Sequence, residues 1–136
     1  MFKRYADIVN ANIQGSDIMV PIDIQNRYKA PLTLYNRTVT SNGNTSDIDV
    51  SQFSVLEIEI KVTSVSGTTP TLDVYIEGKF ENTGDYKTLA SQTGITATGT
   101  WFVTINPCAF RRIRVRWVVG GTSPSFTFRV DGQGMV

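Results

Sequence analysis

A stretch of twelve residues that nearly repeats itself constrains the fold of this chain more than any other feature. Residues 67–78 read GTTPTLDVYIEG, and residues 121–132 read GTSPSFTFRVDG. In each copy a Gly/Thr/Pro turn precedes apolar residues that alternate with polar ones, the pattern of a strand with one buried face. The apolar positions are Leu72, Val74 and Ile76 in the first copy and Phe126, Phe128 and Val130 in the second. The chain therefore builds the same turn and strand twice, which indicates a two-sheeted all-β domain.

The strands that lead into the two copies differ in phase. Val62 lies an even number of positions before Leu72, whereas Val119 lies an odd number before Phe126. Because side chains alternate between the faces of a strand, this difference predicts one extra residue, in a bulge at Gly120-Gly121. Convergent hairpin chemistry and an old duplication both explain such a near-repeat.

From residue 32 onward the chain reads as one strand after another. The expected strands are residues 32–40, 48–50, 55–62, 72–81, 86–90, 101–105, 110–119 and 126–130. Turn signals occupy residues 41–44 and 82–85, and residues 91–100 are polar enough to predict a loop. No long helical pattern separates the strands, which excludes parallel βαβ units. We therefore expect residues 32–136 to form a single β-sandwich of about eight antiparallel strands.

Residues 1–31 differ from the rest of the chain. Apolar residues at positions 5, 8, 9 and 13 suit one turn of helix, and residues 19–24 (MVPIDI) alternate like a strand. Pro21 has no N–H to donate, so that strand belongs at a sheet edge. We interpret residues 1–31 as an extended arm that either folds back on its own domain or reaches a neighbour.

The composition argues against catalysis and against several classes of partner. The chain has no histidine and one cysteine, Cys108, so it has no Ser–His or Cys–His pair and no intrachain disulfide. We expect no enzymatic activity, no cofactor and no catalytic or metal-binding residue. With 13 basic and 12 acidic residues, bulk charge does not favour nucleic acid. The sequence shows no signal peptide and no apolar run of membrane-spanning length, so we expect a cytoplasmic protein or a particle assembled in the cytoplasm.

Four arginines, at positions 111, 112, 114 and 116, form the densest charge cluster. Arg112, Arg114 and Arg116 alternate with apolar residues, so they lie on the outer face of their strand. The interpretation we favour is cross-strand ion pairing on an exposed sheet face with Glu57, Glu59 or Glu77. The competing interpretation is contact with an acidic partner surface.

Aromatic residues provide a second candidate site. Aromatic rings hold sugars in many β-sandwich binding modules. Trp101 and Trp117 share faces with aliphatic residues, so we expect both in the core. Tyr75 and Tyr86 remain as candidates for binding carbohydrate.

The sequence resembles a known class of structural proteins. The segments TVTSNGNTSDIDVSQFSVLEIEIKVTSVSGTTPTLDVYIEG and FRRIRVRWVVGGTSPSFTFRVDG resemble small β-sandwich virion proteins of tailed bacteriophages, of the capsid decoration (cement) type. The likeness covers roughly residues 38–132, and its motifs, G-T-[ST]-P and R-x-R-W, are architectural. It implies a jelly-roll-like sandwich that forms homotrimers on the capsid exterior and bridges neighbouring capsid subunits.

From this resemblance we expect a non-enzymatic virion protein that stabilises the shell through protein–protein contacts. Its expected partners are the major capsid protein or other virion proteins and copies of itself, with no nucleic acid and no membrane. Apolar anchors would come from the arm, at Phe2, Tyr5, Ile8, Val9, Ile13, Ile18, Met19 and Ile22. The alternatives are a carbohydrate-binding module and a tail- or baseplate-associated adhesion protein.

Overall fold

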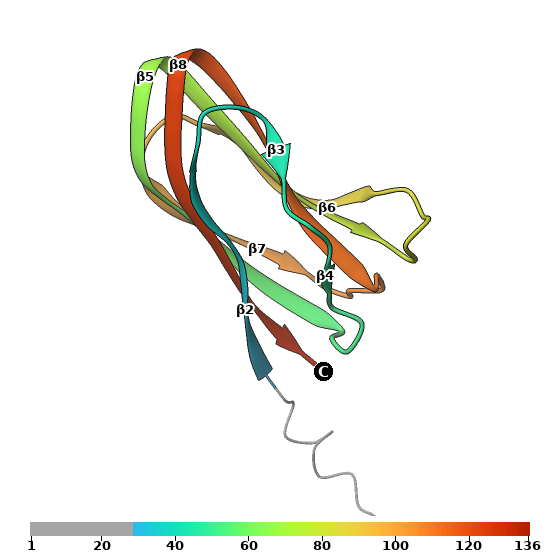
Figure 1. Cartoon of the computed structure of the whole chain (residues 1–136). Coiled ribbons are helices and arrows are strands. Elements are labelled where there is room, and N and C mark those ends of the chain that lie inside the picture. The colour runs from blue at the N-terminus through green and yellow to red at the C-terminus, as the bar shows by residue number, and fades with distance from the viewer. Residues whose placement is uncertain (1–28) are drawn as a thin grey trace, which may run out of the picture.

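The computed structural model describes residues 29–136, which form seven strands paired in antiparallel fashion throughout (Figure 1). They are β2 (Lys29–Val39), β3 (Gly43–Asn44), β4 (Ile48–Asp49), β5 (Val55–Lys79), β6 (Lys87–Ile95), β7 (Gly99–Ile105) and β8 (Arg112–Met135). Residues 29–31, which we had assigned to the arm, lie in β2 opposite residues 133–135. Within residues 29–136 no helix is long and apolar enough to cross a membrane.

The strands make one continuous sheet that folds over on itself into two layers (Figure 1). Layer A has the order β2, residues 122–135 of β8, residues 55–66 of β5, and β7. Layer B has the order β3 and β4, residues 112–120 of β8, residues 71–79 of β5, and β6. Counting the halves of β5 and β8 separately gives four strand positions per layer, the arrangement of an eight-stranded jelly roll. The expected all-β sandwich is confirmed.

The two copies of the near-repeat are corners inside long strands, and not hairpin turns between separate strands. β5 and β8 each continue from one layer into the other, so four of the expected strands are halves of two. Gly67 and Thr69 have positive φ in β5, and Gly121 and Ser123 have positive φ in β8. These residues bend the backbone sharply, while the antiparallel partner bends with it and keeps the ladder of pairs intact.

The two corners also lie directly against one another, with Thr68 opposite Thr122. At the corners the register shifts show an extra residue on each strand, within residues 69–70 of β5 and residues 123–124 of β8, and a third shift leaves one more extra residue on β5, Thr63. The bulge that we expected at Gly120-Gly121 therefore lies slightly later in β8, and β5 has a matching one. The near-repeat reflects this local two-fold arrangement, because each corner meets the same motif in its partner.

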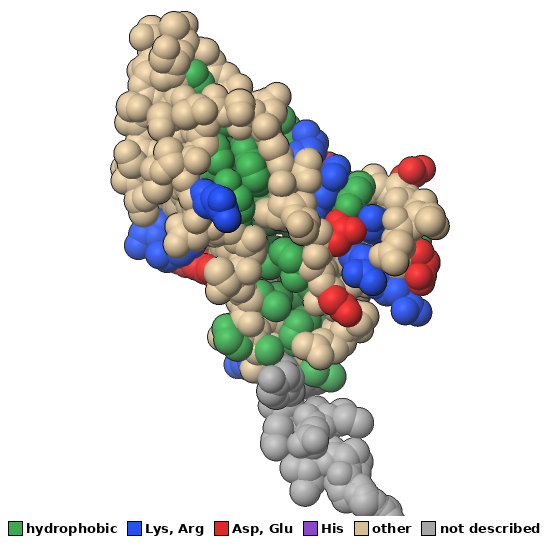
Figure 2. Space-filling model, viewed as in Figure 1, with side chains coloured by type: hydrophobic (Ala, Val, Ile, Leu, Met, Phe, Trp, Pro, Cys, Tyr) green, Lys and Arg blue, Asp and Glu red, His purple; other side chains and the backbone are tan. Residues whose placement is uncertain are grey.

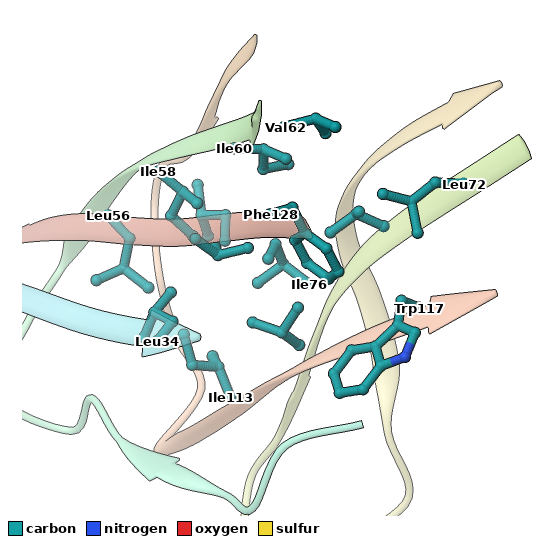
Figure 3. Packing of buried hydrophobic residues seen from close by; sticks show 14 of the residues in the cluster. Leu34, Leu56, Ile58, Ile60, Val62, Leu72, Ile76, Ile113, Trp117 and Phe128 are labelled. Atoms are coloured by element: carbon teal, nitrogen blue, oxygen red, sulfur yellow. The ribbon is translucent and has the colours of Figure 1, made fainter. Parts of the chain in front are cut away.

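The core lies between the layers and follows the predicted alternation (Figure 3). Fully buried side chains come from both halves of β5 and β8, including Leu56, Ile58, Ile60, Leu72, Ile76, Ile113 and Phe128. Trp117 belongs to this cluster and is 6% exposed, and Trp101 packs partly buried at its margin. Both tryptophans thus pack with the core, as their alternation predicted.

Two connections differ from the sequence-based expectation. β6 extends to Ile95 and β7 begins at Gly99, so most of the expected loop at 91–100 is strand. The expected turn at 41–44 contains the short strand β3. These segments are polar because they lie at sheet edges, where alternation of apolar residues is weak. The expected hairpin between β5 and β6 is confirmed by their antiparallel pairing.

Candidate interaction surfaces

The arginine row of β8 lies on the outer face of layer B, opposite β5. Arg112, Arg114 and Arg116 share this face because alternate residues of a strand point the same way. Their cross-strand partners are Lys79 for Arg112, Glu77 for Arg114 and Tyr75 for Arg116. The row is therefore set against one acidic, one basic and one aromatic residue of the neighbouring strand.

Glu77 joins two of the arginines. The Nε atom of Arg114 donates to Oε1 of Glu77 at 2.9 Å, and the Nε atom of Arg116 donates to Oε2 at 2.8 Å. Glu77 is only 6% exposed, so this is an enclosed cluster and not an exposed sheet face. Of the three carboxylates considered as partners, Glu57 and Glu59 lie in layer A, paired opposite Gln133 and Asp131.

Tyr86 covers the row from the loop that connects β5 and β6. The guanidinium carbon of Arg114 lies 3.6 Å from the ring centroid of Tyr86, and Nζ of Lys79 lies 4.6 Å from it. The Tyr86 hydroxyl donates to Oδ1 of Asp47, and Nζ of Lys79 lies 2.8 Å from Oδ2 of the same carboxylate. The loop and the segment before β4 are thereby fastened over β5 and β8. We call these seven residues the arginine cluster: Asp47, Tyr75, Glu77, Lys79, Tyr86, Arg114 and Arg116.

The carbohydrate candidates Tyr75 and Tyr86 both belong to this cluster. The guanidinium of Arg116 lies 4.3 Å from the ring centroid of Tyr75, in the same kind of contact as that between Arg114 and Tyr86. Each ring therefore carries a cation over one face, which removes that face as a surface on which a sugar can stack.

Hydrogen bonding fixes the charges of the cluster. Hydrogen bonds from Lys79 and then Tyr86 lower the pKa of Asp47, and the bond to Asp47 raises the pKa of Lys79. Burial raises the pKa of Glu77, but hydrogen bonds from Arg116 and Arg114 outweigh it, and the net pKa lies below its usual value. All of these groups are charged at neutral pH, so neither carboxyl is held protonated as a general acid would be.

Sequence reasoning missed the part of Asp47 and Lys79 in this cluster. Lys79 continues the outward alternation of residues 73, 75 and 77. This alternation could have predicted that Lys79 lies on the same outer face as Glu77. Asp47 lies in an irregular segment, where no periodicity indicates its partner.

Arg112 lies at the end of the arginine row, opposite Lys79, and is half-buried. In Figure 2, acidic and basic side chains intermingle on one side of the molecule.

A second surface is the outer face of layer A. Phe102 of β7 is 64% exposed, the largest exposed fraction among the large hydrophobic side chains of residues 29–136. It lines a shallow groove of about 320 Å³ together with Glu57, Glu59, Asp131, Gly132 and Gln133. An apolar ring among carboxylates is the composition of a contact for a partner with basic and apolar groups.

A third feature is a cleft beside β2, where the chain crosses from layer A to layer B. It has a volume of about 590 Å³ and is lined by Thr33, Leu34, Tyr35, Asn36, Arg37, Asn44, Thr45, Ser46 and Trp117. The rings of Tyr35 and Trp117 have centroids 4.4 Å apart, and Nε1 of Trp117 donates to the carbonyl of Ser41 at 3.0 Å. Burial raises the pKa of Tyr35, although Arg37 opposes this. We call this feature the edge cleft.

The apolar candidates of the arm lie outside the described residues. They are Phe2, Tyr5, Ile8, Val9, Ile13, Ile18, Met19 and Ile22. The contacts expected of them stay predictions.

Comparisons with known proteins give a likeness of fold. No protein-family model matches the sequence, and no curated protein matches it. Among solved structures, the SPBc2 prophage-derived protein YomS superposes with a TM-score of 0.52 at 15% identity, covering 80% of this chain and 94% of that one.

Two viral structures show a likeness of similar extent. An infectious bursal disease virus structure, of the Gt strain, superposes with a TM-score of 0.54 at 13% identity, over 81% of this chain and 33% of that one. The VP2 subviral particle of infectious bursal disease virus gives 0.53 at 14% identity, over 80% and 32%. This chain spans about a third of the length of those viral chains. At such identities the likeness shows a shared β-sandwich fold.

Proposed function

We propose that this chain is a structural virion protein of the capsid decoration type, which stabilises a shell through protein–protein contacts. The observation that carries the proposal is the jelly-roll arrangement of its two layers, a fold that it shares with a prophage-derived protein over nearly all of that protein's length. The resemblance of residues 38–132 to phage decoration proteins supports the same function.

The chemistry of the described residues supports a binding function over a catalytic one. The most concentrated charges are engaged with one another in the arginine cluster, where Glu77 and Asp47 are each held by cations. Groups committed to such pairs fasten loops to a sheet and are not free to transfer protons. Within residues 29–136 the exposed Phe102 groove is a surface that a partner can contact. The proposal adds the apolar residues of the arm as further contacts.

In this proposal the arm supplies anchors to the major capsid protein or another virion protein. As the resemblance to phage decoration proteins implies, copies of the chain assemble as a homotrimer with closed symmetry. The protein acts on the virion, after assembly in the host cytoplasm.

Co-sedimentation of the full chain with shells of the major capsid protein from the same genome tests the proposal. We expect a trimer by light scattering that pellets with shells. Replacing Tyr5, Ile8 and Ile13 together by serine is expected to weaken pelleting at least about tenfold, because each residue loses apolar burial. The matched control replaces Asn10 and Asn12, which lie among the anchors, by serine. Full pelleting of the triple variant would contradict the function given to the arm, and no pelleting of the wild type would contradict the proposal.

A glycan array separates this function from carbohydrate binding, the principal alternative. We expect no binding that depends on Tyr75, because Arg116 covers one face of its ring. Reproducible binding by the wild type that is lost in Tyr75→Ala would favour the alternative.

A further inference from the structure

The outer face of layer A places carboxylates next to one another. Glu59 of β5 lies directly opposite Asp131 of β8, and Glu57 lies two residues before Glu59 on the same face. Like charges directly opposite one another on neighbouring strands destabilise a sheet. Arg129 offsets part of this repulsion, because its Nη2 atom lies 3.3 Å from Oε1 of Glu59 and its Nε atom lies 2.5 Å from Oδ2 of Asp131.

Glu57 is the carboxylate of this group that Arg129 does not contact. Its Oε1 atom accepts a hydrogen bond from the hydroxyl of Thr104, and no cation of residues 29–136 forms an ion pair with it. Lys61, the next cation along β5, lies on the other side of Glu59 and does not line the Phe102 groove. Glu57 is also exposed, so a cationic partner can contact it.

Phe102 lies beside these carboxylates. It is opposite Glu59 in the pairing of β7 with β5, and Thr104, two residues later, is opposite Glu57. Side chains directly opposite one another are about 5 Å apart, and diagonal ones about 7–8 Å. A side chain that stacks on the exposed ring of Phe102 can therefore also contact either glutamate.

The arginine cluster shows which side chain such a combination of groups binds. The Nε atom of Arg114 donates to Glu77 while its guanidinium covers the ring of Tyr86. Arg116 donates to the same carboxylate and covers the ring of Tyr75. The outer face of layer A offers the same two groups, a carboxylate and an aromatic ring in neighbouring positions. No guanidinium of residues 29–136 covers the ring there.

We propose that the Phe102 groove binds an arginine side chain of a second virion protein. The guanidinium would stack on the ring of Phe102 and donate to the carboxylate of Glu57, while Glu59 adds negative charge beside it. Arginine fits better than lysine, because a guanidinium is planar and donates in a fork, whereas an ammonium is a compact point charge. The inference rests on the proposed function for the source of the partner, and it names the chemistry of one contact with that partner.

Titration of the full, isotope-labelled chain with short peptides, followed by NMR, tests the inference. The probe is the peptide acetyl-Gly-Leu-Arg-Leu-Gly-amide, and two matched peptides carry lysine or citrulline in place of arginine. We expect the arginine peptide to shift the amide signals of Glu57, Glu59 and Phe102. It should bind at least about threefold more tightly than the lysine peptide, and at least about tenfold more tightly than the uncharged citrulline peptide.

Two single variants show whether the groove is the binding site. Phe102→Ala and Glu57→Gln should each weaken binding of the arginine peptide at least about threefold. The matched controls are Phe80→Ala and Glu81→Gln, which remove an exposed ring and an exposed carboxylate outside the groove and should leave binding unchanged. Glu57→Gln should not lower the free energy of unfolding, because it removes a like charge from beside Glu59.

Several results would overturn the inference. Equal affinity for the arginine and citrulline peptides is one, and wild-type affinity in both Phe102→Ala and Glu57→Gln is another. An arginine of the same chain or of a second copy is the competing occupant. Nuclear Overhauser contacts between an arginine side chain and the ring of Phe102, before any peptide is added, would assign the groove to that occupant.

Shell pelleting is a separate measurement from peptide binding. Peptide binding by a chain that does not pellet with shells would contradict the proposed function and the source of the partner, but not the specificity for arginine. Pelleting by a chain that does not bind the arginine peptide would contradict this inference alone.

Discussion

Glu77 is the residue that connects the two arginines and the two tyrosines of the arginine cluster. One of its carboxylate oxygens contacts Arg114 and the other contacts Arg116, and the residue is only 6% exposed. Each guanidinium also covers a tyrosine ring, at 3.6 Å for Arg114 and 4.3 Å for Arg116. Through these two guanidiniums Glu77 contributes to the position of both aromatic rings, and Tyr86 is held in addition by Asp47 and Lys79.

Glu77→Gln is expected to destabilise the protein by about 1–3 kcal/mol, because two charge-assisted hydrogen bonds weaken and two guanidiniums lose their counter-charge. Urea unfolding followed by tryptophan fluorescence measures the change. The matched control is Glu81→Gln, whose partner Arg111 lies 3.2 Å away with both side chains about two-thirds exposed. This exposed pair should contribute less than about 1 kcal/mol. Equal effects of the two variants would show that the burial of Glu77 is of no consequence.

The lowered pKa values of Asp47 and Glu77 predict loss of stability in acid. In the unfolded chain these carboxyls bind protons near pH 4, whereas in the folded protein they bind them at lower pH. Their stabilisation is thus complete above about pH 5 and is lost as the pH falls through the folded pKa values. Unfolding free energies measured between about pH 2.5 and 7 should fall less steeply in Glu77→Gln than in the wild type. Identical slopes would contradict the assignment.

At the scale of elements, the corners of β5 and β8 explain the near-repeat of the sequence. A Cβ atom on Gly67 would lie 2.7 Å from the carbonyl oxygen of Ser123, and one on Gly121 would lie 2.6 Å from that of Thr69. Both glycines also have φ above 100°. At each corner the backbone of the opposite strand approaches too closely for a side chain. Glycine is therefore required at both positions.

Gly121→Ala is expected to destabilise the protein by about 3 kcal/mol or more, because strain in φ is added to a backbone clash. Gly94→Ala is the control, since Gly94 has a positive φ of 69° but nothing within 4 Å of an added Cβ atom. Gly94→Ala should lower the free energy of unfolding by only about 1–2 kcal/mol. Thermal unfolding of both variants provides the comparison, and a smaller loss for Gly121→Ala would refute the close approach of the corners.

The alternation of apolar residues predicted the inward rows of β7 and of both halves of β5 and β8, because burial on one face has a period of two. It gave no inward row for β2, where a bulge between Thr33 and Tyr35 breaks the alternation. It did not predict that β5 and β8 are continuous. Gly-Thr-Thr-Pro ordinarily ends a strand, and only its pairing with the second copy preserves the ladder. Alternation places Glu57, Glu59 and Glu77 alike on outer strand faces, as possible partners of the arginines. Only the cross-strand register shows that Glu77 is the one that lies beside them.

At the scale of the whole molecule, the fold is dominated by contacts between distant residues. Val55 pairs with Met135, and Lys29 pairs with the same residue from the other side. β7 and β6 are placed on opposite layers by the two halves of β5. The central pairs of the sheet can therefore form only after most of the chain is available.

This topology predicts slow folding, with a time constant of milliseconds to seconds, because long loops must close before the central pairs form. Stopped-flow refolding from urea, followed by the fluorescence of Trp101 and Trp117, measures it. Refolding complete within about 100 microseconds would mean that local contacts dominate.

The passage of β5 and β8 through both layers has a mechanical consequence. A force applied to one layer is transmitted to the other along the backbones of β5 and β8. In a sandwich whose layers are joined only by loops, the force would be transmitted through the loops and through packing of the core side chains. The halves cannot slide apart unless the corners open and the hydrogen bonds between these two strands rupture in succession. Separating the two layers of this molecule by force would therefore require its corners to unfold.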